Sequence, residues 1–267
     1  MTLSAIPGSP AARLGAGGVS DARFAGNRVV AAASIEAAAG PGGVTRLPVL
    51  ASQVPLVLRR TPSAVYVVGG AAGPIGGDSL SLRITVGAGA FLRVRTAAAS
   101  IALPGLDGLE SVLRVSVTVA AGGRLEYLPE PVVVTAGARH ATLVSATLCA
   151  GASLVLREEV LLGRHGEAGG SCRSVLRVSY AGRPLLRHSL EVSGTDAASL
   201  GPAVLAGHRA VGTLLRVGTA ETAEIPVTAT PEVAFMPLAG PGSLVTALAH
   251  DAVSLRRRLR HEARPPG

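Results

Sequence analysis

Three short glycine-containing turns of similar sequence constrain this chain more than any other feature. They are residues 87–90, 121–124 and 150–153, and each joins two runs in which apolar and polar residues alternate. Side chains on a strand point to opposite faces in turn, so this alternation predicts strands with one buried face. Glycine accepts positive φ without steric cost, and a short loop containing it between two such runs is typical of a β-hairpin. The sequence therefore predicts antiparallel hairpins that recur at intervals of about 30 residues.

The likeness of the turns leaves two interpretations open. The hairpins are copies of one structural repeat, or they reflect the strand periodicity of any all-β protein. A fourth pair of alternating runs, 176–180 and 186–192, surrounds the turn at 181–184. We favour the repeat, because the turns resemble one another in sequence as well as in spacing.

Two segments are predicted to be helical. From Ser243, a plausible N-cap, apolar residues fall at helical spacing to position 259, and arginines cluster toward the end, which predicts a C-terminal helix over 243–260. Thr195 or Asp196 is placed to cap a short helix that runs toward Leu205. The short Pro-flanked runs 225–227 and 233–235 suit edge strands. We expect residues 1–20, rich in Gly, Ala, Ser and Pro, to be disordered, and residues 21–267 to form one β-rich domain.

Composition narrows the class of protein. Apolar residues make up 48% of the 267, but aromatics only 2%, so the core must consist of aliphatic side chains. The formal charge is +8 and every basic residue except histidine is arginine. Neither stacking aromatics nor a groove-binding motif accompanies this charge, which argues against nucleic acid. The two cysteines lack metal or disulfide spacing, and neither a signal peptide nor an 18-residue apolar stretch is visible. We therefore expect a cytoplasmic protein that does not span a membrane.

No local motif predicts catalysis. The chain contains no G-x-S-x-G elbow, H-E-x-x-H, C-x-x-C or acidic cluster of the kind that binds Mg²⁺ or Ca²⁺. Its six histidines are widely separated, and His188, between Leu186 and Leu190, is expected on the inward face of a strand. A hydrogen-bonded core histidine is favoured there over a metal ligand. The glycine-rich stretch 69–78 lacks the lysine and the spacing of phosphate-binding loops, so we interpret it as a tight backbone passage.

Two carboxylates stand out by position. Asp78 closes the glycine-rich stretch immediately before an apolar strand, and Glu158 follows Leu154 and Leu156 at a period of two, which directs it inward. A buried carboxylate must be paired, protonated or in contact with water. Two hypotheses stay open: an ion pair with one of the many arginines, or the lining of a water-filled passage.

Five segments in order resemble the urease accessory protein family UreD, also called UreH. They are the stretch from Gly69-Gly70 through Gly76-Gly77-Asp78, the hairpin 86–90 with the alanine-rich 96–99, Leu125 to Pro131 with its Pro129-Glu130, 158–166, and 182–186. The resemblance covers about residues 44–217. Two places depart from the family pattern: Ser100-Ile101-Ala102-Leu103 replaces polar residues that many members carry, and the C-terminal helix is less clearly matched.

The resemblance implies a fold and a function. It implies a mainly β protein, an elongated bundle of antiparallel hairpins and sheets with about two helices, which is not itself an enzyme. It also implies that the protein binds UreF, which recruits UreG, and that the assembly docks on apo-urease and assists nickel delivery. Nickel would then pass transiently, with no tightly bound cofactor, and Asp78 and Glu158 would suit such a path.

Two other classes of protein are alternatives to this family. A non-catalytic β-rich binding module of other specificity, for instance for carbohydrate, is disfavoured by the scarcity of aromatic side chains that stack on sugars. A hydrolase would need a nucleophile–base pair, which no local spacing reveals.

Overall fold

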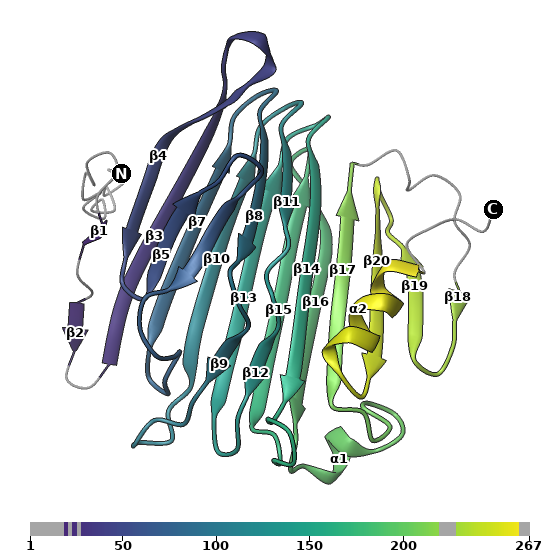
Figure 1. The fold of residues 1–267 in the computed structure, drawn as a ribbon. Coiled ribbons are helices and arrows are strands. Elements are labelled where there is room, and N and C mark those ends of the chain that lie inside the picture. The colour runs from purple at the N-terminus through teal and green to yellow at the C-terminus, as the bar shows by residue number, and fades with distance from the viewer. Residues whose placement is uncertain (1–18, 21–22, 26–27, 219–227, 262–267) are drawn as a thin grey trace, which may run out of the picture.

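Two β-sheets that face each other make up most of the protein (Figure 1). The computed structural model describes residues 19–20, 23–25, 28–218 and 228–261. The back sheet contains, in spatial order, β2 (Arg23–Ala25), β3 (Arg28–Ala39), β7 (Ser79–Val86), β10 (Ser111–Val119), β13 (Arg139–Leu148), β15 (Ser171–Tyr180) and β16 (Arg183–Ser193).

The front sheet begins where β4 (Thr45–Gln53), which pairs with β3, meets β5. β1 (Val19–Ser20) pairs with the end of β4. The short 3₁₀ turn η1 (Pro41–Gly43) precedes β4. The front strands are, in spatial order, β5 (Leu56–Arg60), β6 (Val65–Gly69), β8 (Phe91–Thr96), β11 (Arg124–Tyr127), β14 (Ser153–Leu162), β17 (Ala210–Val217), β20 (Gly242–Ala249), β19 (Val233–Pro237) and β18 (Thr228–Ala229). Two short strands, β9 (Ser100–Ala102) and β12 (Val132–Val134), extend this sheet beside the second half of β14.

The mainly β class with two helices, one near the C-terminus, is confirmed, but the hairpins predicted at the three similar turns are wrong. β7 pairs in parallel with β3 and β10 of the back sheet, whereas β8 pairs in parallel with β6 and β11 of the front sheet. Each turn therefore carries the chain from one sheet to the other. The chain winds as a flattened coil, and one strand of each coil pairs with its equivalent in the next.

The turns stack on one another, which explains why they are alike. Gly89, Gly122 and Gly151 occupy positive φ, between 67° and 74°, as a tight turn requires. The Gly89 amide donates to the Ala121 carbonyl of the next coil at 3.3 Å. A repeat is thus present, with β7, β10, β13 and β15 as its equivalent strands. Alternation could not separate a hairpin from this crossover, because in both cases one face of each strand is buried.

Antiparallel pairing joins β2 to β6 in succession near the N-terminus and appears again in the C-terminal third. β15 and β16 form the fourth predicted pair around its 181–184 turn, and that prediction is confirmed. β14, β17, β20 and β19 then continue the front sheet in alternating directions. β19 has neighbours on both sides, so Val233–Pro237 is not an edge strand as predicted. The predicted strand 225–227 and residues 1–18 of the predicted disordered segment lie outside the described residues.

The C-terminal helix is shorter than predicted, and Ser243 is not its cap. α2 spans Ala252–His261, whereas residues 243–249 belong to β20, which pairs with β17 and β19. Leu244 packs between the sheets and Val245 packs under α2, so this strand is buried on both faces and lacks a strict alternation. Asp251 provides the cap, accepting from the Ser254 amide at 2.8 Å.

The first helix, α1 (Ala197–Leu200), is capped by Asp196 as predicted but ends before Leu205. Its cap oxygen accepts from the Ser199 amide at 2.9 Å.

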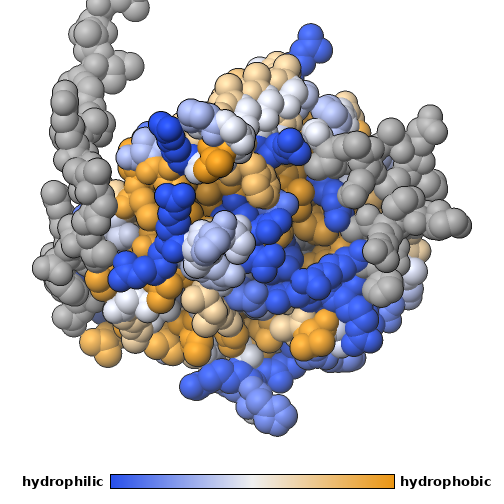
Figure 2. All heavy atoms as spheres, turned by 45° about the horizontal axis from the view of Figure 1, so that its top comes forward, coloured by the Kyte–Doolittle hydropathy of each residue, from blue (hydrophilic) through white to orange (hydrophobic). Residues whose placement is uncertain are grey.

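Aliphatic side chains from both sheets form the main core, as the composition predicts. Among the fully buried ones are Ile35, Ile84, Leu125, Leu154 and Leu176. A second cluster lies on the outer face of the front sheet, where Leu255 and Leu259 of α2 cover Val245. Burial of one such leucine stabilises the fold by about 1.5–3 kcal/mol. At the end where the turns lie, hydrophilic and apolar side chains are interspersed over the surface (Figure 2).

Candidate functional site

Polar side chains from both sheets meet inside the otherwise aliphatic core. We call Glu158, Ser174, His188 and Thr213 the inter-sheet polar cluster. Leu154 and Leu156 of β14 are fully buried between the sheets, and Glu158 continues their row inward, as the alternation predicts. Its Oε2 accepts a hydrogen bond from Ser174 Oγ of β15, across the two sheets, at 3.0 Å.

The Glu158 carboxyl is held in a mostly apolar environment. Its Oε1 is buried and has no hydrogen-bond partner among the described protein atoms. Burial raises the pKa of Glu158 to about 7, while the Ser174 hydrogen bond lowers it by a smaller amount. No arginine of the described chain pairs with this carboxyl, so the ion-pair hypothesis does not describe it. A group of this kind is suited to exchange a proton or to contact a cation near neutral pH.

Thr213 and His188 extend the cluster to a cleft. Thr213 lies directly opposite Glu158 on the neighbouring strand β17, so both side chains are on the inner face. Thr213 Oγ1 and His188 Nδ1 are buried without a hydrogen-bond partner in the described chain, and burial lowers the pKa of His188. His188 is therefore half-buried rather than a fully buried core histidine, and its Nδ1 is unpaired within the described chain.

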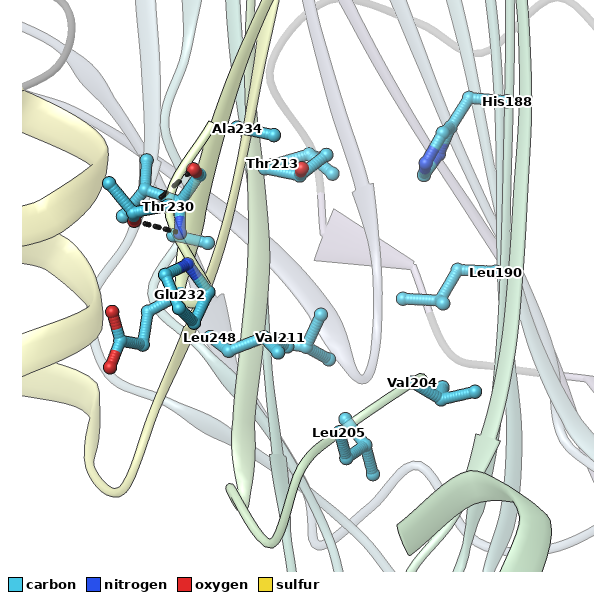
Figure 3. Close-up of a pocket in the computed structure, with 14 residues that line it drawn as sticks. His188, Leu190, Val204, Leu205, Val211, Thr213, Thr230, Glu232, Ala234 and Leu248 are labelled. Atoms are coloured by element: carbon cyan, nitrogen blue, oxygen red, sulfur yellow. Dashed lines mark hydrogen bonds between the residues drawn. The ribbon is translucent and has the colours of Figure 1, made fainter. Parts of the chain in front are cut away.

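The cleft between β16 and strands β17–β20 has a volume of about 240 Å³. Figure 3 shows His188 and Leu190 on one side facing Thr213 and Val211 on the other, with Val204 and Leu205 near one end. Pockets for drug-sized molecules measure about 300–1,000 Å³. The cleft is thus suited to water and small ions rather than to a larger organic substrate.

A second buried polar group lies further along the back sheet. Ser111, His140 and Cys172 stand side by side on β10, β13 and β15. His140 Nδ1 is 2.9 Å from Ser111 Oγ, and its Nε2 is 3.3 Å from Thr142 Oγ1. Burial lowers the pKa of His140 to about 4, so this imidazole is neutral at pH 7.

Asp78 is buried but lies apart from the cluster, and both of its carboxylate oxygens are occupied. Oδ1 accepts from the Val29 amide at 2.9 Å, and Oδ2 accepts from the Ile75 amide at 2.8 Å. These bonds tie the glycine-rich passage to β3. The sequence pointed to Asp78 and Glu158 as a pair of inward carboxylates. In the structure, Asp78 accepts backbone hydrogen bonds and holds two segments together. Glu158 instead lies opposite Thr213, which lines the cleft.

The other residues of the UreD-like segments make contacts that hold parts of the fold together. A Cβ on Gly76 would lie 2.5 Å from the Gly105 amide nitrogen, so two loops meet there backbone to backbone. Gly77 occupies φ +93°. Glu130, which follows Pro129, binds Arg256 of α2 at 2.9 Å.

Sequence reasoning missed Ser174, Thr213 and His140. Their signal was a polar residue at an inward strand position, but their partners come from other strands and cannot be read locally. Among the residues that the structure describes, no group of three or more His, Cys, Asp or Glu side chains is placed to hold a metal ion. Neither described helix is long and apolar enough to cross a membrane.

Comparison with known proteins agrees with the family resemblance seen in the sequence. The family model described as UreD urease accessory protein matches residues 30–264. The chain is similar to proteins named urease accessory protein UreD from Parafrankia sp. (strain EAN1pec), 45% identical over 86% of this chain and 86% of that protein, and from Frankia alni, 44% identical over 90% and 94%. A third relative, urease accessory protein UreD 3 of Streptomyces griseus, is 45% identical over 80% of this chain and 88% of its own length.

Proposed function

This chain belongs to the UreD urease accessory protein family, and from that premise we propose that it is a non-catalytic scaffold which helps to load nickel into urease. In this proposal it binds UreF and UreG, the complex docks on apo-urease in the cytoplasm, and Ni²⁺ passes through the inter-sheet polar cluster. Nickel is then a cargo of the protein, not a resident cofactor.

The observation that supports the nickel path is the set of unpaired polar atoms at Glu158, Thr213 and His188. A buried polar atom without a partner costs about 1–3 kcal/mol, and native proteins leave few of them. Such atoms are expected where a protein contacts water or an ion. Two of them, at Thr213 and His188, line one cleft, and the third, at Glu158, lies opposite Thr213 on the neighbouring strand, so their grouping is a specific feature of this fold.

The chemistry of these atoms suits transit rather than storage. Carboxylate, imidazole and hydroxyl groups are ligands that a borderline cation such as Ni²⁺ accepts. An ion that is to move on must be held weakly, at successive sites. The neutral His188 imidazole offers a lone pair, and Glu158 offers charge once its proton leaves.

The test is replacement of Glu158 by alanine or glutamine, with two measurements on each variant. Recovery of the complex with UreF and UreG reports folding and partner binding, and activation of apo-urease at limiting Ni²⁺ reports nickel delivery. We expect the complex to be recovered in full and the activation rate to fall. The exposed Glu36 of β3 provides the matched control, Glu36→Ala, which should leave both unchanged. Full activation with an intact complex would exclude the path through Glu158, and failure of the wild-type chain to bind UreF would exclude the scaffold role.

A further inference from the structure

A groove lies between α2 and the neighbouring part of the front sheet, and the inter-sheet polar cluster plays no part in it. α2 packs mainly on β20, β17 and β14, and the groove opens on its β12 side. We call this the α2 groove and define it by Ala99, Val133 and Leu161 on the sheet side and Val253, Arg257 and Arg260 on the helix side. Glu130 and Arg256 also line it and pair with each other. The rest of its sheet side is apolar, and the unpaired charges on its helix side are basic.

The helix side presents an apolar residue and two cations in one line. Val253, Arg257 and Arg260 follow the spacing i, i+4, i+7, which places them on one face of α2. Val253 is 74% exposed, unusual for a large aliphatic side chain, and both arginines are exposed. Within the described residues neither arginine forms an ion pair.

The groove is held open by fixed contacts. Arg256, on the adjacent face of α2, is engaged with Glu130 and Glu159, so its charge is already compensated. The Glu130 amide donates to Thr96 Oγ1 at 2.8 Å, which links two of the segments that resemble the UreD family. A surface that is ordered before binding loses less conformational entropy when a partner arrives.

We propose that the α2 groove is a docking surface for an acidic segment of a protein partner, whose carboxylates pair with Arg257 and Arg260 while its apolar side chains contact Val253 and Val133. Charge complementarity selects this occupant, because the free charges of the groove are all positive. A nucleic acid would meet no aromatic side chain among its lining residues on which to stack a base. The proposal rests on the proposed function, which supplies the class of partner: a component of urease maturation.

The experiment measures binding of the full chain to purified UreF, to the UreF–UreG complex and to apo-urease, each separately. The test variant is Arg257→Glu with Arg260→Glu, and the matched control is Arg177→Glu, an exposed arginine on the outer face of the back sheet. We expect the double reversal to weaken binding of at least one component about tenfold or more, mainly through slower association, and the control to change none. The wild-type affinity for that component should also fall as salt is raised.

A thermal unfolding curve verifies that the double reversal is folded; if it is not, Arg257→Gln with Arg260→Gln removes the charges without repulsion and is expected to weaken the same component. Unchanged binding of all components by folded variants would overturn the docking surface but leave the proposed function standing. Binding of none by the wild-type chain would overturn both. The same variants are also tested for binding to a single-stranded RNA and to phosphatidylserine vesicles. If the double reversal weakens binding to one of these and leaves protein binding intact, the occupant of the groove is not a protein segment.

Discussion

Arg256 of α2 donates two hydrogen bonds to Glu159 of β14, from Nε at 3.1 Å and from Nη2 at 2.5 Å. The Glu159 side chain has no exposed surface, and its second partner, Arg157, lies 3.3 Å away. Arg256 also binds Glu130. Two carboxylates, one on β14 and one in the loop between β11 and β12, thus hold the C-terminal helix through one guanidinium, and this fixes the position of the α2 groove.

Arg256→Ala is expected to lower the free energy of unfolding by about 2–4 kcal/mol. Removal of one partner from a buried ion pair costs about 3–5 kcal/mol, and Arg157 offsets part of the loss by remaining near Glu159. Urea denaturation followed by circular dichroism measures the change. Arg257→Ala, one position along the helix and exposed, should stay within about 0.5 kcal/mol of the wild type. Equal effects of the two substitutions would contradict a structural role for the Arg256 bridge.

Gly76→Ala is expected to destabilise the fold by about 1–3 kcal/mol, the usual cost of overpacking. The added methyl would lie 2.5 Å from the Gly105 nitrogen and 2.6 Å from the Leu109 carbonyl oxygen, both backbone atoms that cannot rotate away. Gly69→Ala is the control, because the nearest heavy atom to its Cβ would be 3.8 Å away. A thermal unfolding midpoint that stays the same for Gly76→Ala would show that the two loops can separate freely.

The two cysteines should differ in reactivity. Cys149 is exposed, whereas Cys172 is buried, and burial raises the pKa of its thiol to about 12. The thiolate is the reactive form, so Cys172 should be inert in the native protein. Titration with a thiol reagent is expected to modify one cysteine per native chain and both in denaturant. Rapid modification of both in the native state would contradict the packing of β15 against the front sheet.

Side-chain alternation along a single strand predicted correctly which side chains point inward. It could not predict which strands pair or which sheets face each other. The inward direction of Glu158 followed from Leu154 and Leu156 on the same strand. Its hydrogen-bond partner Ser174 lies on the other sheet, and nothing near either residue encodes that contact. The turns at 87–90 and 121–124 were located correctly, but a glycine turn permits either a hairpin or a crossover, and only the packing of successive coils selects between them.

The error over residues 243–249 has a related cause. Leu244 and Leu248 are four residues apart, a spacing that suits a helix face as well as a strand covered on both sides. Here β17, β19 and α2 surround the segment, so tertiary contacts override the local pattern. The polar residues Thr213 and His188 form a candidate site only because β17 of the front sheet and β16 of the back sheet meet at one cleft.

Glu158 makes the stability of the apo-protein dependent on pH in a defined direction. Burial raises the pKa of Glu158 from 4.5 to about 7, so between these values the folded chain retains a proton that the unfolded chain has released. The free energy of unfolding must then decrease as pH rises through this window. The total loss is about 3 kcal/mol above pH 7, at 1.36 kcal/mol for each pKa unit.

Glu158→Gln removes this loss, because the amide stays neutral at every pH and still accepts from Ser174. We expect the stability gained by the variant over the wild type to grow by about 2–3 kcal/mol between pH 5 and pH 8, as follows from the same shift. Urea denaturation of both proteins at the two pH values, without nickel, measures the difference. Glu36→Gln, at an exposed position of β3, should show no such growth. If the difference between Glu158→Gln and the wild type is independent of pH, the carboxyl is solvated in the folded protein, and the inter-sheet polar cluster is more open than its burial indicates.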